Sequence, residues 1–243
     1  MFVDDNLDVE VPRALLAGLA HCNALARVPA QLDQAGGESN NVSGFKQIAV
    51  LVVPDQLRIP ADVAADDRAG AREMTEYLLD LGHQRIGFVV GSPVQIASEQ
   101  RLDGYRDALA GAGGQLDPRL VLQGDFDFVS GLEAGRVLLA RGEGRPTAIF
   151  ASNDDMAAGV LAAAHEIGID VPGELSVAGF DDTPLASQVW PALTTVHQPV
   201  YDIAARATEI VIAALRGETP DQAQPILPTR LIIRQSTAAP VRR

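Results

Sequence analysis

From Gln47 onward the chain alternates short β-rich runs with longer amphipathic segments, and this alternation limits the fold more than any other feature. The first run, QIAVLVV at Gln47–Val53, is almost entirely apolar, as in a buried strand. The next segment, Ala65–Gly82, has leucines towards its end and a glycine as its stop, which indicates a helix. The later predicted strands are 85–91, 119–126, 147–153, 175–182 and 226–236, with a short extended segment at 193–199. The later predicted helices are 98–113, 130–142, 155–168 and 201–217. Strands separated by helices of this length form right-handed βαβ units, so the sequence predicts an α/β fold with a parallel sheet.

The composition argues against several classes of function. A net charge of -13 with a single lysine is the opposite of the clustered positive charge that binds nucleic-acid phosphates. The single cysteine, Cys22, excludes a disulfide framework, and the four histidines lack a metal-binding spacing. The sequence contains no nucleophile elbow, phosphate-binding loop or dinucleotide-binding motif. We therefore predict a non-enzymatic protein with no metal and no cofactor.

The beginning of the chain differs from the rest. MFVDDNLDVE is acidic and unlike a signal peptide, and no apolar run reaches the roughly 18 residues that a membrane span needs. These features predict a cytoplasmic protein without membrane contact. Residues 1–46 contain one candidate helix followed by a polar stretch rich in glycine, asparagine and serine. We expect this segment to be partly helical and partly disordered.

Polar side chains follow two of the predicted strands directly. IFASNDD ends in Asn153, Asp154 and Asp155, and SVAGFDD ends in Asp181 and Asp182. Since ligands of open α/β sheets bind outside the carboxyl ends of the strands, these groups are expected at one crevice. An amide both donates and accepts, so we predict that Asn153 faces a ligand while Asp154 or Asp155 caps the following helix. The alternative is that all three residues cap the helix or are solvated.

Longer motifs carry a family resemblance. DDRAGAREMTEYLLDLGHQRIGFVVG, RLDGYRDAL, SNDDMAAG, LSVAGFDD and PALTTVHQP resemble the effector-binding core of the lactose/galactose-repressor (LacI/GalR) family, from about Ile48 to Ser236. The resemblance implies a two-lobed, periplasmic-binding-protein-like fold with a small ligand in the cleft. It assigns 66–197 and 227–237 to the C-terminal lobe, and 47–65 and 198–226 to a remnant of the N-terminal lobe. Neither the helix-turn-helix headpiece nor the opening of the N-terminal lobe is recognisable, so we expect that lobe to be incomplete.

The resemblance also assigns the ligand contacts, which are Arg101, Phe126, Asn153, Asp181 and Gln198. The guanidinium of Arg101 offers several donors in a fixed fork, and the alternative for this residue is an exposed helix arginine. Asp181 would accept hydrogen bonds from ligand hydroxyls, whereas Asp182 better fits a turn or a cap. Phe126 would pack on a sugar or a purine, and the alternative is core packing. Gln198 would contact the ligand from the crossing between the lobes.

These observations together predict the effector-sensing domain of a bacterial transcriptional regulator that binds a small hydroxylated metabolite, most simply a sugar. Operator DNA is expected to be bound only through a headpiece that is absent here, and a homodimer is expected to be weak. The alternative, from another class, is a stand-alone solute-binding protein of a transport system.

Overall fold

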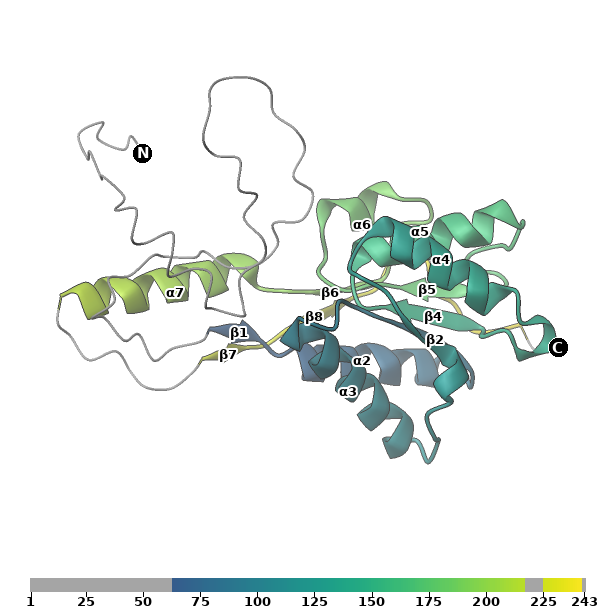
Figure 1. The fold of residues 1–243 in the computed structure, drawn as a ribbon, viewed down its shortest axis with the longest axis horizontal. Coiled ribbons are helices and arrows are strands. Elements are labelled where there is room, and N and C mark those ends of the chain that lie inside the picture. The colour runs from purple at the N-terminus through teal and green to yellow at the C-terminus, as the bar shows by residue number, and fades with distance from the viewer. Residues whose placement is uncertain (1–62, 217–224, 242–243) are drawn as a thin grey trace, which may run out of the picture. The chain divides into compact units, whose positions relative to one another are not determined.

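The computed structural model describes residues 63–216 and 225–241, which are drawn in colour in Figure 1. The chain divides into two compact units, residues 62–203 with 224–243 and residues 1–61 with 204–223. The strand predicted at 47–53 and the mixed segment predicted at 1–46 lie outside the described residues. All of the strands below belong to the unit made of 62–203 and 224–243.

Four parallel strands form the central sheet of this unit. They are β2 (Ile86–Val90), β3 (Val121–Gln123), β4 (Ala148–Ala151) and β5 (Ser176–Ala178). Their order across the sheet is β3-β2-β4-β5. Every residue of β2, β4 and β5 is buried, which explains why these runs are nearly all apolar rather than alternating. The predicted α/β fold with a parallel sheet is confirmed.

Helices cover both faces of this sheet (Figure 1). They are α2 (Asp67–Asp80), α3 (Ile96–Gly111), α4 (Phe128–Leu139) and α5 (Asp154–Glu166). Ile86, Phe88 and Val90 of β2 pack in one apolar cluster with α2 and α3, whereas Val89 packs in another with α4 and α5. Successive side chains of a strand point to opposite faces, so one short strand contributes to both layers.

The helices α4 and α5 approach each other closely because glycines stand where they touch. A methyl group on Gly159 of α5 would overlap the Phe128 carbonyl oxygen of α4, and one on Gly131 of α4 would overlap the backbone of Met156. Burying the helix pair against the sheet therefore requires small residues at this contact. The Ala-rich character of α5 follows from the same requirement, since Ala157, Ala163 and Ala164 are all fully buried.

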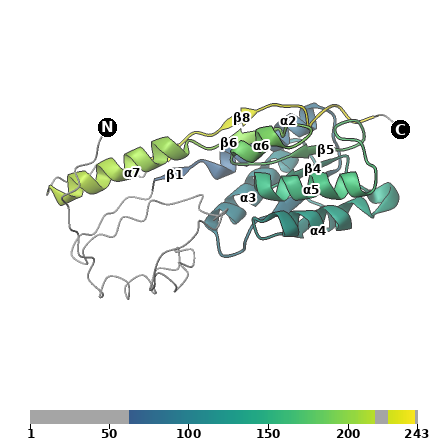
Figure 2. The ribbon, with the colours of Figure 1, turned by 90° about the horizontal axis from the view of Figure 1, so that it is seen from above.

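Further short elements complete the unit. They are β1 (Ala64–Ala65), the 3-10 helices Pro118–Leu120 and Gly142–Gly144, α6 (Pro184–Gln188), β6 (Thr195–His197), β7 (Ile226–Leu227) and β8 (Arg230–Ile232). β6 pairs antiparallel with β8, as the two adjacent strands of Figure 2 show, and single parallel bridges join Ala178 to Thr194 and Asp181 to His197. β1 pairs parallel with β7. The helix α7 (Val200–Leu215) follows β6 in sequence.

The continuous strand predicted at 226–236 is wrong, because the structure divides it into β7 and β8. Pro228 lies between them, and proline has no N–H to donate to a strand ladder. In the described ranges, no helix is long and apolar enough to cross a membrane. The same residues contain no cluster of histidine, cysteine, aspartate or glutamate suited to a metal ion.

Candidate functional site

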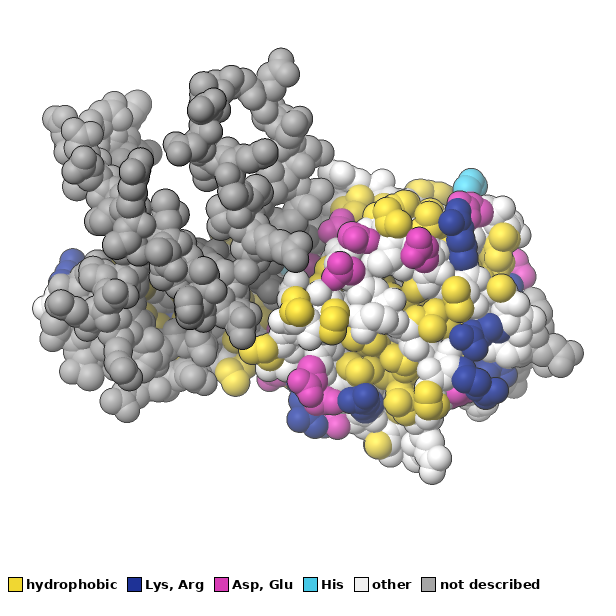
Figure 3. Space-filling view, in the orientation of Figure 1, with side chains coloured by type: hydrophobic (Ala, Val, Ile, Leu, Met, Phe, Trp, Pro, Cys, Tyr) yellow, Lys and Arg dark blue, Asp and Glu magenta, His cyan; other side chains and the backbone are white. Residues whose placement is uncertain are grey.

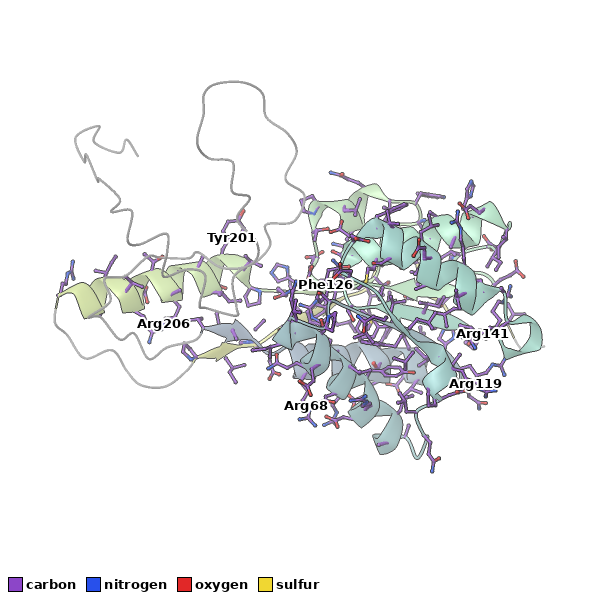
Figure 4. All side chains as sticks on the ribbon, viewed as in Figure 1. Arg68, Arg119, Phe126, Arg141, Tyr201 and Arg206 are labelled. Carbon is purple, nitrogen blue, oxygen red and sulfur yellow. The ribbon has the colours of Figure 1, made fainter. Side chains whose placement is uncertain are left out.

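The carboxyl edge of the sheet gathers side chains from several segments. β3 leads to Phe126, β4 to Ser152 and Asn153, and β5 to Phe180 and Asp181. Figure 4 shows Phe126 at this edge of the unit. Because parallel strands end together, residues far apart in sequence become neighbours here, as the sequence predicts.

Arg101 of α3 occupies the centre of this edge. Its side chain is buried, with the residue only 1% exposed, so the alternative of an exposed helix arginine is wrong. Its Nε donates to Asp67 Oδ1 at 2.7 Å, and its Nη1 donates to the Ser152 carbonyl oxygen and lies 3.3 Å from Asp181 Oδ1. Its Nη2 is buried and has no hydrogen-bond partner among the described residues. Within the described residues, one nitrogen of this buried cation, with its two N–H groups, is therefore left without an acceptor.

Two aromatic rings contact the same guanidinium. Its central carbon lies 3.9 Å from the ring centre of Phe180 and 5.7 Å from that of Phe126. Phe180 is fully buried, whereas Phe126 is partly exposed. The Phe126 ring packs where a methyl group on Gly91 would stand, so the glycine after β2 makes room for it. Both rings lie within cation–π distance of the guanidinium, and the ring of the two that is partly exposed is that of Phe126.

Asp181 links Arg101 to Gln198. Its Oδ1 accepts a hydrogen bond of 2.5 Å from Gln198 Nε2, and its backbone N–H donates to the Val196 carbonyl at 2.8 Å. Gln198 is buried. The backbone of Asp181 has a φ of 106°, and Phe126 a φ of 61°, both in the left-handed region that non-glycine residues rarely adopt. Such conformations cost about 1–3 kcal/mol each and concentrate at functional sites.

Asn153 is the N-cap of α5, and the expected cap at Asp154 or Asp155 is wrong. Its Oδ1 accepts from the Met156 N–H at 2.9 Å, and its Nδ2 donates to the Phe126 carbonyl oxygen at 2.9 Å. The amide therefore holds the loop that carries Phe126 while it caps the helix. The prediction that Asn153 also contacts a ligand remains a prediction.

Asp154 has a different role from the one the sequence suggested. It is fully buried, and its carboxylate accepts from the Thr183 N–H at 2.7 Å and from Thr195 Oγ1 at 2.6 Å. These bonds tie the start of α5 to the loop after β5 and to β6. Asp154 thus fixes the segment that carries Asp181.

Asp182 is held by ionic contacts rather than acting as a cap. Arg234 Nη2 lies 2.6 Å from Asp182 Oδ1, and His197 Nδ1 lies 2.9 Å from its Oδ2. Partial burial works to raise the pKa of Asp182, but the hydrogen bonds and charges of Arg234 and His197 outweigh it. The net result is a pKa below the usual aspartate value.

Comparison with known proteins identifies the fold. Residues 75–237 match the family described as "Periplasmic binding protein-like domain". The crystal structure of a LacI family transcriptional regulator from Mycobacterium smegmatis is 30% identical with a TM-score of 0.67, covering 76% of this chain and 69% of that chain. The chain belongs to the LacI/GalR family.

Other LacI/GalR relatives are covered over a smaller share of their length. The HTH-type transcriptional regulator DegA of Bacillus subtilis is 35% identical over 206 residues, which are 82% of this chain and 60% of DegA. The structure titled "transcriptional regulator CelR-cellobiose complex" is 34% identical with a TM-score of 0.70, covering 76% of this chain and 56% of that one. The chain spans about half to three-fifths of the length of the curated relatives it matches. These relatives are named as transcriptional regulators, and the LacI/GalR family is not enzymatic.

Sequence reasoning missed two residues that contact Arg101, namely Asp67 and Phe180. Asp66 caps α2 by accepting from the Ala69 N–H at 2.9 Å, which leaves the second aspartate of the pair to turn inward. A doubled acid at a helix start was the available signal, because one cap needs only one carboxylate. Phe180 precedes Asp181 in the motif GFDD, where an apolar residue is expected to belong to the core. It does lie in the apolar core, in addition to its contact with Arg101.

Proposed function

We propose that this chain is the effector-sensing part of a LacI/GalR-type transcriptional regulator and that it binds a small hydroxylated molecule, most simply a sugar, at Arg101. The observation that carries the proposal is the buried Arg101 Nη2, which has no hydrogen-bond partner among the described residues and belongs to a guanidinium flanked by two carboxylates and a partly exposed aromatic ring. The cellobiose complex of the CelR relative supports a sugar as the ligand.

Each group at the edge has a role that its chemistry supports. Arg101 Nη2 donates to a ligand oxygen, and Asp181 accepts from a ligand hydroxyl. The Phe126 ring packs on the apolar face of a sugar ring. Asn153 and Gln198 line the site and hold Phe126 and Asp181 in place through the hydrogen bonds above. Ligand binding regulates the protein when the affinity differs between two conformations, which shifts their populations.

Operator DNA, in this proposal, is bound by a helix-turn-helix headpiece rather than by the described residues. Several arginines on the surface of the described residues are paired with carboxylates, as some adjacent blue and magenta side chains of Figure 3 illustrate, whereas the exposed Arg85, Arg216 and Arg230 are outside these ion pairs. The exposed pairs are Arg68–Asp107, Arg72–Glu76, Arg106–Asp103, Arg119–Asp117, Arg136–Glu166 and Arg206–Glu209. Cations neutralised in this way release few counterions from DNA. The proposal includes a cytoplasmic location and a weak homodimer.

The test is calorimetric titration of the chain with a panel of neutral mono- and disaccharides that includes cellobiose, ribose and galactose. Asp181→Asn keeps the shape and an acceptor for Gln198 but removes the charge. Loss of one charged hydrogen bond of about 1.5–3 kcal/mol should weaken binding about 10- to 150-fold. Asp125→Asn, an exposed residue of the β3–α4 loop, is the matched control and should bind as the unmodified chain does.

Arg101→Ala is a poor test of binding, because it would leave Asp67 buried without its cation and lower stability. Arg101→Lys keeps the charge and loses the fork, so it should fold and bind weakly. Binding of no sugar by the unmodified chain would contradict a sugar as the effector. Equal affinities of the unmodified chain and Asp181→Asn would remove Asp181 from the site.

A further inference from the structure

The guanidinium of Arg101 is held by acceptors from two different segments. Its Nε donates to Asp67 Oδ1 at 2.7 Å, and its Nη1 donates to the Ser152 carbonyl oxygen. Asp67 lies in the first turn of α2, whereas Ser152 follows β4. A guanidinium is planar, and its N–H groups have fixed directions within that plane. Two acceptors on two of its nitrogens therefore determine the direction of the third nitrogen, Nη2.

Asp67 supplies one of these two acceptors with its side chain. The other acceptor is the backbone oxygen of Ser152, which a change of side chain leaves in the chain. Asp181 lies 3.3 Å from Nη1, and the proposed function makes it a ligand contact. The side chains of Asp67 and Arg101 are 9% and 2% exposed, so close packing restricts both of them. The carboxylate of Asp67 can therefore fix the guanidinium without being a ligand contact itself.

The neighbouring aspartate already provides the cap of α2. Asp66 accepts from the Ala69 N–H at 2.9 Å, within its own helix. Asp67 instead accepts from Arg101, which belongs to α3. The start of α2 thus has its N-cap without Asp67, and the hydrogen bond that Asp67 adds is the one to Arg101.

We infer that Asp67 is a positioning residue of the effector site, which orients the guanidinium of Arg101 so that Nη2 is presented to the ligand. The inference rests on the proposed function, and it adds the residue that sets the geometry of the Arg101 contact. The direction of Nη2 depends on where the acceptor of Nε lies. The place of the Asp67 oxygen is therefore decisive, and its negative charge is not.

Two substitutions separate the place of that oxygen from its charge. Asp67→Asn keeps an oxygen in the same place and removes the charge, so its affinity for the ligand should stay within about threefold of that of the unmodified chain. Asp67→Glu keeps the charge and displaces the carboxylate by the length of a methylene group. The guanidinium should then turn, and the affinity should fall about 10- to 100-fold because the hydrogen bond from Nη2 to the ligand is lost.

The affinities are measured by calorimetry with galactose, ribose and cellobiose as the probes. Asp66→Glu is the matched control, because it makes the same change one residue earlier, at a side chain that bonds to its own helix. It should lower the melting temperature through a weaker cap and leave the affinity unchanged. The inference is wrong if Asp67→Glu binds as tightly as the unmodified chain, or if Asp67→Asn binds as weakly as Asp67→Glu.

Thermal melts identify a variant that fails to fold. Asp67→Ser then replaces Asp67→Glu, because serine is smaller than aspartate and does not overfill the buried space. Its hydroxyl oxygen is too close to the backbone to take the place of the carboxylate oxygen. Asp67→Ser should weaken binding by the same factor as Asp67→Glu, and unchanged affinity would overturn the inference.

A measurement without ligand separates failure of the inference from failure of the proposed function. The Nε–H signal of Arg101 is recorded by NMR on the chain with isotope-labelled arginine, and its loss in Arg101→Lys assigns it. The guanidinium carbon lies 3.9 Å from the ring centre of Phe180, so ring currents make this signal sensitive to orientation. The signal should shift strongly in Asp67→Glu and little in Asp66→Glu. An unshifted signal in Asp67→Glu would overturn the inference, whereas absence of binding by every probe sugar contradicts the proposed function and leaves this signal to decide the role of Asp67.

Discussion

Asp154→Ala should destabilise this protein far more than an ordinary substitution in the first turn of a helix. The carboxylate of Asp154 is fully buried and accepts from the Thr183 N–H at 2.7 Å and from Thr195 Oγ1 at 2.6 Å. Alanine removes both acceptors and leaves a buried backbone N–H and a buried hydroxyl without their partner. A buried donor without an acceptor has lost its hydrogen bonds to water and gained none in return. The loss of stability should therefore exceed the loss caused by removing a helix cap.

The magnitude follows from the two hydrogen bonds. A hydrogen bond to a charged group contributes about 1.5–3 kcal/mol, so losing both should lower the free energy of unfolding by about 3–6 kcal/mol. A domain of this size loses roughly 2–4 °C in Tm for each kcal/mol, which predicts a fall of about 10 °C. Urea unfolding followed by circular dichroism, together with thermal melts, measures both quantities.

Asp155→Ala is the matched control, because Asp155 is the next residue in the same helical turn and is partly exposed. It should lose only its favourable interaction with the helix dipole, less than about 1 kcal/mol. If Asp154→Ala and Asp155→Ala unfold at the same urea concentration, Asp154 is not the tie between α5, the β5–α6 loop and β6.

Two further predictions concern other parts of the unit. Burial lowers the pKa of His83 against the opposing effect of its hydrogen bond to the Ala238 carbonyl, so the neutral form is favoured in the folded state. As the pH falls, the unfolded chain therefore takes up the proton on His83 before the folded chain does. The free energy of unfolding should be constant above about pH 6.5 and decrease below it. Urea titrations at about pH 7.5 and 5.5 measure this decrease, which should be smaller for His83→Asn. Gly91→Ala places a methyl group in the space of the Phe126 ring. It should lower stability by about 1–3 kcal/mol, measured in thermal melts, and should weaken sugar binding, measured by calorimetry. Unchanged binding would mean that Phe126 is not part of the site.

Much of the central sheet could be predicted because its strands are buried on both faces. β2 and β4 need apolar residues at every position, so their runs stand out from the helices around them. The helices were equally clear, since α2 and α5 begin with polar caps and continue at helical spacing. The short helix α6 and the division of β7 from β8 were missed because each depends on a local proline rather than on periodicity.

The candidate site was harder to predict, because polar side chains that are adjacent in sequence take different roles. Asp66 and Asp67 differ only by one step around a helix, yet one caps α2 in solvent and the other pairs with the buried Arg101. In the pair Asn153 and Asp154, the amide rather than the carboxylate caps α5, and the carboxylate reaches across to Thr183. The assignment depends on which side chain meets the neighbouring loop, and a single sequence does not contain that information.

At the carboxyl edge of the sheet, the same residues stabilise the fold and form the candidate site. The choice of residue therefore determines whether a substitution can change ligand binding without changing stability. Asn153 caps α5 and holds the Phe126 loop with the same amide, so its loss would change stability and the aromatic surface together. Arg101 is an anchor of α2 through Asp67 and a donor to the crevice through Nη2. Asp181 is different, because its carboxylate faces Arg101 and Gln198 while its backbone N–H donates to the Val196 carbonyl oxygen of β6. An isosteric loss of charge at Asp181 therefore changes the chemistry of the crevice and leaves the strand pairing in place.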